Sequence, residues 1–254
     1  MTSIDFLKTI PNIDKEKIGL LGHSEGSMIS FLAANNNNDI SFIVSLAGPG
    51  VKGKELFLSQ AKYGLQKMDI PENSVNEIIK LYSSIIEIIS TNSVKSIMKL
   101  EIKEQLSNWI PQQDSITKVG AGLIYSGNRW TSKGAGLDMF LSHIMKPWMK
   151  YFISYNPKEI LINVHCPILI LNGKEDTLVD CQQNINGFKS LANELNRTNY
   201  EFYEFPDLNH MFQHCSTGDI SEYSLIEETI SPEVLLVIYN WINKIIEIKT
   251  AANK

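Results

Sequence analysis

The sequence predicts an α/β fold whose sheet is mostly parallel, and three observations predict it. An apolar, strand-like run ends near Leu21, and a helix-compatible run to Ala34 follows it. A second strand-like run covers 40–47, and a strand, a helix and a strand in this order form a parallel pair with a right-handed crossover. Two more strand-like runs, 166–173 and 200–205, follow a long helical stretch. With 254 residues, 43% of them hydrophobic, the chain can bury a substantial core.

The elements follow from the spacing of apolar residues and from the residues that begin and end helices. Pro11 ends an amphipathic helical segment, and Pro232 occupies the first turn of the last helix, where its missing N–H is harmless. In chain order we expect a short helix over 2–10, a strand over 17–21, a helix over 24–34, a strand over 40–47, helices within 54–150, a strand over 166–173, a helix over 182–195, a strand over 200–205 and a helix from 231 to about 248.

The stretch 54–150 interrupts the alternation of strands and helices. Its apolar residues recur at helical spacing, and its glycine-rich part, 118–128, is expected to be irregular. We therefore predict an α/β core of residues 1–53 and 151–254, incomplete at its amino end, and a helical cap of residues 54–150 over the active site. The stretch 54–150 also carries large apolar side chains, which suit a cap that lines an acyl or aromatic pocket: Trp109, Trp130, Met139, Phe140, Met145, Trp148 and Met149.

The junction between the first strand and its helix carries the pattern Gly22-x-Ser24-x-Gly26, which is typical of a nucleophile elbow. The serine must adopt a strained backbone conformation, and we expect the two glycines to remove collisions between the crossing strand and helix. The turn exposes the Ser24 hydroxyl at the carboxyl edge of the sheet. It also directs the backbone N–H of Glu25 toward a developing oxyanion, at the positive end of the new helix.

Serine needs a base to remove its proton, and five histidines are available: His23, His143, His165, His210 and His214. His210 follows the last strand at the edge to which the elbow points, and His214 is its one serious rival. An acid to orient the base should also follow a strand. Asp176 does so three residues after Gly173, and the other carboxylates that could serve are Glu175, Asp180 and Asp207. Ser24, Asp176 and His210 stand in the chain order of the α/β-hydrolase triad.

Several motifs together resemble one branch of the bacterial α/β-hydrolase superfamily, the serine-aminopeptidase-like or dienelactone-hydrolase-like esterases. They are Gly22-His-Ser-Glu-Gly26, Leu46-Ala-Gly-Pro-Gly-Val51, 148–157, 166–176, Leu208-Asn-His-Met-Phe-Gln213 and 226–233. The resemblance covers most of the chain from Lys17 to Trp241. It implies Ser24 as the nucleophile, His210 as the base and Asp176 as the acid. Ser27 stands where the relatives usually carry a second glycine.

The resemblance implies a carboxylesterase that hydrolyses small acyl esters through an acyl-enzyme and needs no cofactor. Two other functions stay open: a catalytically impaired α/β-hydrolase fragment that binds a ligand or a partner, and an acyltransferase in which an alcohol or amine replaces water. A full α/β-hydrolase has about four strands before the elbow strand, whereas sixteen residues precede Lys17 here. We therefore expect the edge of the elbow strand to pair with a second copy, giving a homodimer, or with an amino-terminal segment.

Composition excludes several other classes. The net charge of −5 provides no basic surface for nucleic acid, and no apolar run is long enough to span a membrane. Met1-Thr-Ser-Ile-Asp lacks the features of a signal peptide. The three cysteines have no spacing typical of a metal site, and reduced thiols in a cytoplasmic protein are the simplest interpretation.

Overall fold

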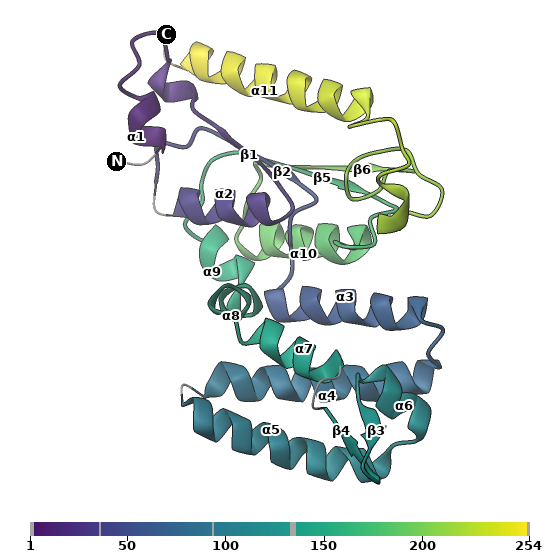
Figure 1. Cartoon of the computed structure of the whole chain (residues 1–254). Coiled ribbons are helices and arrows are strands. Elements are labelled where there is room, and N and C mark those ends of the chain that lie inside the picture. Colours follow the sequence, from purple (N-terminus) through teal and green to yellow (C-terminus); the bar gives the residue numbers. More distant parts are fainter. Residues whose placement is uncertain (1–2, 36, 93, 133–135, 253–254) are drawn as a thin grey trace. The chain divides into compact units, whose positions relative to one another are not determined.

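The computed structural model describes residues 3–35, 37–92, 94–132 and 136–252, so Thr2 of the predicted first helix lies outside the described residues. The chain forms two compact units. We call them the sheet unit, Met1–Val51 with Asn156–Lys254, and the helical unit, Lys52–Tyr155. Figure 1 shows the first in purple, green and yellow and the second in blue and teal.

The sheet unit contains four parallel strands, as the sequence predicted. Their order is β1 (Leu20–His23), β2 (Ile43–Leu46), β5 (Ile168–Gly173) and β6 (Tyr200–Phe205). Within the part of the chain that the structure describes, β1 lies at one edge of this sheet. The Leu21 side chain on β1 is 58% exposed. Pairing of this edge with another strand stays a prediction.

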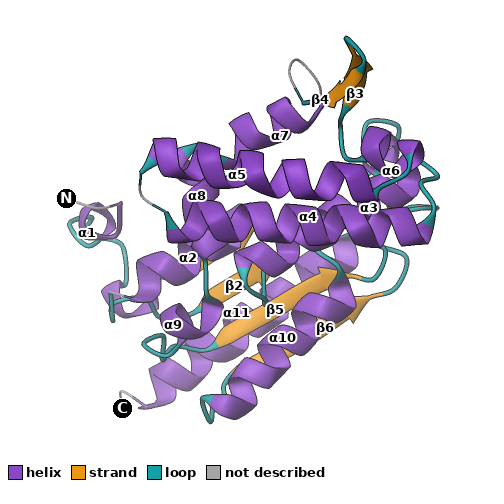
Figure 2. Ribbon diagram, turned by 90° about the horizontal axis from the view of Figure 1, so that it is seen from below, coloured by secondary structure: helices purple, strands orange, loops and turns teal. Residues whose placement is uncertain are grey.

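Helices cover both faces of the sheet. Helices α2 (Glu25–Asn35) and α10 (Cys181–Glu194) lie on one face, and α11 (Pro232–Ala252) lies on the other (Figures 1 and 2). Because side chains alternate along a strand, both faces need apolar residues, which explains the largely apolar sequences of β2 and β5. The layer beneath α11 is a buried cluster that includes Val44, Leu46, Leu169, Leu171, Val234, Ile238, Trp241 and Ile245.

Short elements of the sheet unit depart from the predicted ones. The first strand was expected from Lys17, but Lys15–Lys17 form a 3₁₀ turn, η1, whose start is capped by the Asp14 side chain. The strand therefore begins at Leu20. Helix α9 (Pro157–Leu161) was not predicted, and the Asn156 side chain caps it. The remaining short elements of this unit are α1 (Ser3–Leu7) and η3 (Ile220–Glu222).

The helical unit is built around α4 (Glu72–Thr91), which packs against α3 (Gly53–Lys67), α5 (Lys95–Trp109) and α6 (Ser115–Gly120) (Figure 2). Its apolar side chains recur at helical spacing and are buried: Val75, Ile78, Tyr82, Ile85, Ile86 and Ile89. The other helices are η2 (Ile110–Gln112), α7 (Gly136–Ile144) and α8 (Pro147–Ser154).

One prediction for the helical unit was wrong. The region 118–128 was expected to be irregular, but it contains the end of α6 and the first strand of an antiparallel hairpin, β3 (Ile124–Ser126) with β4 (Arg129–Thr131). Gly127 and Asn128 both have positive φ, 55° and 60°, which is the geometry of a two-residue type I′ turn. The Gly-Asn pair in the sequence was the signal for this turn.

Among the described helices, none is both long and apolar enough to cross a membrane.

Candidate active site

The elbow at Ser24 has the strained backbone that its motif predicts. Ser24 lies between the end of β1 and the start of α2 and has a φ of 54°, in the left-handed region. Its backbone N–H donates to the Leu46 carbonyl of the neighbouring strand at 2.8 Å. Glu25 is the first residue of α2, so its N–H has no acceptor within the helix and is available to an oxyanion.

The two elbow glycines differ, which corrects the expectation that both relieve a collision. A Cβ added at Gly22 would lie 2.2 Å from the carbonyl oxygen of Gly26. A Cβ added at Gly26 would meet nothing within 4 Å among the described residues. The strand side of the elbow therefore requires glycine, whereas the helix side has room for a side chain.

The Ser27 side chain, which departs from the relatives' pattern, lies in the space behind the elbow. Its hydroxyl and the Ser45 hydroxyl form a hydrogen bond in which both residues are fully buried. A Cβ added at Gly48 would lie 2.2 Å from the Ser27 Oγ. The serine at this position therefore fills a small polar space between α2 and β2.

Asp176 and His210 form a buried pair at the carboxyl edge of the sheet. Asp176 follows β5, His210 follows β6, and Ser24 follows β1, so all three residues belong to the same edge. The His210 Nδ1 lies 2.8 Å from the Asp176 Oδ2, and both side chains are almost fully buried. Because a carboxylate accepts, Nδ1 carries the proton and Nε2 of a neutral ring is left free as a base.

The Asp176 carboxylate is held by further donors. Its Oδ1 accepts the backbone N–H of Leu178 at 2.9 Å and of Val179 at 2.8 Å. Its Oδ2 accepts the Asn172 amide at 3.2 Å as well as the His210 ring. The carboxylate is thus satisfied on both oxygens and fixed in orientation, as an acid that orients a histidine must be.

The loop that carries His210 is shaped by its own polar side chains. The buried Asn209 accepts the backbone N–H groups of Met211 at 2.9 Å and Gln213 at 3.0 Å. The Phe212 carbonyl accepts the Ser231 N–H at 2.8 Å, which ties the loop to the start of α11. This scaffold fixes the backbone at His210.

His23, the residue before Ser24, contacts this loop directly. Its Nε2 lies 2.8 Å from the His210 carbonyl oxygen, and the two ring centroids are 4.7 Å apart. The carbonyl can only accept, so the His23 Nε2 carries a proton. Burial lowers the pKa of His23 below 6.5, and this effect outweighs the hydrogen bond to the His210 carbonyl, which acts in the opposite direction. His23 is therefore a neutral link between the elbow and the histidine loop.

The other histidines have different surroundings. His214 is largely exposed and pairs with Glu228, whose Oε2 lies 2.9 Å from its Nδ1. His165 is exposed, and its Nδ1 accepts from Arg197 Nη1 at 2.9 Å. His143 belongs to α7 of the helical unit.

One alternative acid also has a structural role. The Asp180 side chain caps α10 by accepting the Gln183 N–H at 2.7 Å.

A tyrosine that sequence reasoning missed lies beside the buried pair. The Tyr223 hydroxyl is buried and has no hydrogen-bond partner within the described part of the chain. Burial raises the pKa of Tyr223 to about 12, and the charge of Asp176 adds to the effect. The segment that carries Tyr223 packs on the acid turn, where the Thr177 hydroxyl donates to the Gly218 carbonyl at 3.0 Å. No local pattern in the sequence signals this contact.

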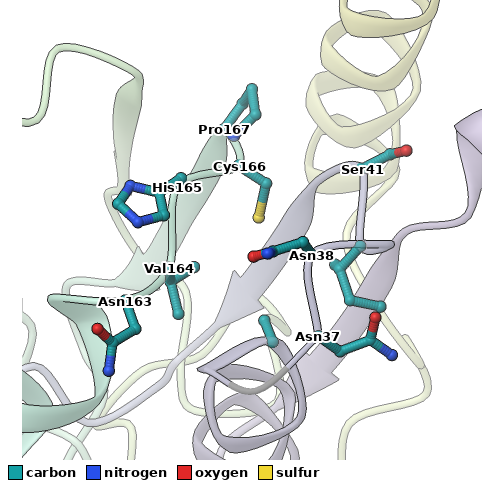
Figure 3. Close-up of a pocket in the computed structure, with 10 residues that line it drawn as sticks. Asn37, Asn38, Ser41, Asn163, Val164, His165, Cys166 and Pro167 are labelled. Atoms are coloured by element: carbon teal, nitrogen blue, oxygen red, sulfur yellow. The ribbon is translucent and has the colours of Figure 1, made fainter.

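A cavity of about 450 Å³ lies at the opposite edge of the sheet, next to the amino ends of β2 and β5. Figure 3 shows it between the turn at Asn37 and Asn38 and the loop from Asn163 to Pro167. None of Ser24, Asp176 and His210 lines this cavity. It is therefore separate from the candidate active site.

Among the described residues, no group of three or more His, Cys, Asp or Glu side chains is placed to hold a metal ion.

Comparisons with known proteins add the following. Residues 2–119, less than half of the chain, match the family model described as BAAT / acyl-CoA thioester hydrolase C terminal. A search of curated proteins found no match.

Solved structures were compared as well. An acylaminoacyl peptidase of Pyrococcus horikoshii has 14% identity and a TM-score of 0.37, with 81% of this chain and 22% of that chain covered. The Pyrococcus furiosus esterase PF2001 has 13% identity and a TM-score of 0.38, with 80% and 50% covered. DcsB, in complex with its substrate analogue, has 16% identity and a TM-score of 0.44, with 95% and 69% covered. The chain thus spans half or less of the length of the first two.

The family model is named for thioester hydrolases, whereas the motifs resembled esterases, and both belong to one superfamily. Two features of the structure fit the nucleophile elbow of an α/β-hydrolase fold: the parallel sheet and the left-handed Ser24 at a strand-to-helix turn. The chain therefore has an α/β fold, and over residues 2–119 it is similar to the acyl-CoA thioester hydrolase C-terminal family.

Proposed function

We propose that the chain is a serine hydrolase that cleaves small carboxylic esters through an acyl-enzyme. The observation that carries the proposal is the buried pair of Asp176 and His210 at the same sheet edge as the elbow residue Ser24. Burial strengthens the bond between the carboxylate and the ring, and the protonated Nδ1 leaves Nε2 free to act as a base.

In the proposed reaction, the Ser24 Oγ forms a bond to the acyl carbon while its proton moves to Nε2 of His210. The carbonyl oxygen becomes an oxyanion, to which the Glu25 N–H donates. The tetrahedral intermediate then expels the alcohol, which takes the proton from Nε2. A water molecule attacks the acyl-enzyme with the same base, which releases the acid and restores Ser24.

Acyl-CoA thioesters are the second candidate substrates, and the family model over residues 2–119 favours them. The same acyl-enzyme would form, with a thiolate in place of an alkoxide as the leaving group. A thiolate leaves more readily, so acylation by a thioester depends less on protonation of the leaving group by His210.

The test is turnover of p-nitrophenyl acetate and of acetyl-CoA by the 254-residue chain. Ser24→Ala is the control, because it removes the nucleophile from the elbow. We expect turnover of at least one substrate that is lost in Ser24→Ala, with the ratio of the two rates deciding between ester and thioester. Equal turnover by wild type and variant would exclude Ser24 as the nucleophile.

Two other outcomes correspond to the remaining functions. Saturable binding of an acyl ligand without turnover would indicate a binding module. Transfer of the acyl group to an added alcohol or amine, detected by product analysis, would indicate an acyltransferase.

A further inference from the structure

A buried amide on β5 contacts the acid of the candidate triad, and nothing in the motif pattern points to it. Asn172 is the last residue but one of β5, and its side chain is almost fully buried. We propose that Asn172 is a positioning residue that holds the Asp176 carboxylate in the orientation needed to align His210. The inference rests on the proposed function.

The Asn172 Nδ2 lies near three acceptors. It is 3.2 Å from the Asp176 Oδ2, 3.2 Å from the Gly173 carbonyl and 3.1 Å from the Val179 carbonyl. The two carbonyls lie on either side of the turn that carries Asp176. One amide group therefore links both ends of this turn to the carboxylate between them.

The position of the contact on the carboxylate gives it a specific effect. Asn172 donates to Oδ2, which is the oxygen that the His210 Nδ1–H also contacts. The backbone N–H groups of Leu178 and Val179 hold only the other oxygen, Oδ1. Without Asn172, the carboxylate would keep its anchor at Oδ1 but could rotate Oδ2 away from the ring.

Asn184 provides a matched control. It is also a fully buried asparagine, and it also uses both ends of its amide. Its Oδ1 accepts the Gly50 N–H and its Nδ2 donates to the Asp180 carbonyl, each at 2.9 Å. Within the described part of the chain its side chain bonds neither Asp176 nor His210, so its loss should affect stability alone.

The experiment compares Asn172→Leu with Asn184→Leu in the full chain. Asn172→Leu should lower kcat by about tenfold or more, because a hydrogen bond to a charged group is strong enough for its loss to have an effect of that size. We expect KM of Asn172→Leu to stay within about twofold of wild type. Asn184→Leu should leave kcat within about twofold of wild type. If Asn172→Leu does not fold, Asn172→Ser replaces it, because the shorter hydroxyl can still bond a backbone carbonyl but cannot reach Asp176.

A proton NMR measurement reads the same contact without turnover. The proton shared by His210 Nδ1 and Asp176 should give a downfield resonance that Asp176→Asn removes. We expect Asn172→Leu to move or broaden this resonance and Asn184→Leu to leave it unchanged. An unchanged resonance in a folded Asn172 variant would overturn the inference, as would an unchanged kcat. Absence of Ser24-dependent turnover in wild type would count against the proposed function, and the resonance would still decide the role of Asn172.

Discussion

The two glycines of the elbow, identical in the motif, should respond in opposite ways to a single methyl group. In Gly22→Ala the new Cβ would lie 2.2 Å from the Gly26 carbonyl oxygen, whereas ordinary contacts begin at 3.4 Å. The obstacle is backbone at the start of α2, so the strand and the helix would have to separate by about 1 Å. Overpacking of this kind costs about 1–3 kcal/mol or more, and the upper end applies because no flexible side chain can yield.

In Gly26→Ala the new methyl group would enter open space at the second position of α2. Alanine is favoured over glycine in helices by about 0.5–1 kcal/mol, so this variant should be slightly more stable than wild type. For a chain of this size, 1 kcal/mol shifts Tm by about 2–4 °C. We therefore expect Gly22→Ala to lower Tm by about 6 °C or more and Gly26→Ala to raise it by about 1–4 °C.

Calorimetry on the two variants, with Ser24-dependent ester turnover on the same samples, is the assay. Gly22→Ala should also lose turnover, because the displaced helix start would move the Glu25 N–H away from the oxyanion. Equal losses of Tm in both variants would refute the reasoning, since they would mean that a side chain at residue 26 meets an obstacle.

Three further predictions concern residues around the site. His23→Gln should weaken the pH dependence of stability. The folded pKa of His23 lies below the unfolded value of 6.5, so the stability that neutral His23 contributes is complete above pH 6.5 and is lost as the pH falls below that value. Comparing Tm at pH 7.5 and 5.5 measures the effect, and an identical Tm difference in wild type and variant would contradict it. Ser27→Ala should destabilise the chain by about 1–3 kcal/mol in urea unfolding, because it leaves the Ser45 hydroxyl buried and unpaired. The double variant with Ser45→Ala should recover part of that loss, whereas additive losses would show that the two hydroxyls are not coupled. His214→Gln should keep ester turnover within about twofold, whereas His210→Gln should lose about 10³-fold or more; the reverse result would make His214 the base.

Local signals in the sequence were enough to predict the parallel sheet and the elbow. A strand followed by Gly22-x-Ser24-x-Gly26 and a helix constrains the backbone within a few residues, and the left-handed φ of Ser24 follows from that constraint. The alternation of strands and helices predicted parallel pairing because a crossover connection permits little else. The boundaries were less accurate, since caps such as Asp14 and turns such as Gly127-Asn128 act over two or three residues.

The contacts that distinguish one polar residue from another were decided only by the tertiary structure. The sequence favoured Asp176 and His210 by their places after strands, but left Asp180, His214 and others open. Their hydrogen bonds separate them, because Asp180 caps a helix and His214 pairs with Glu228. The contacts of His23 with His210 and of Asn172 with Asp176 have no pattern of their own. The His23–His210 contact arises because parallel strands far apart in the sequence end at one edge, which a sequence read locally does not contain. Asn172 lies only four residues before Asp176, and their contact depends on how the turn between Gly173 and Val179 folds back onto the end of β5.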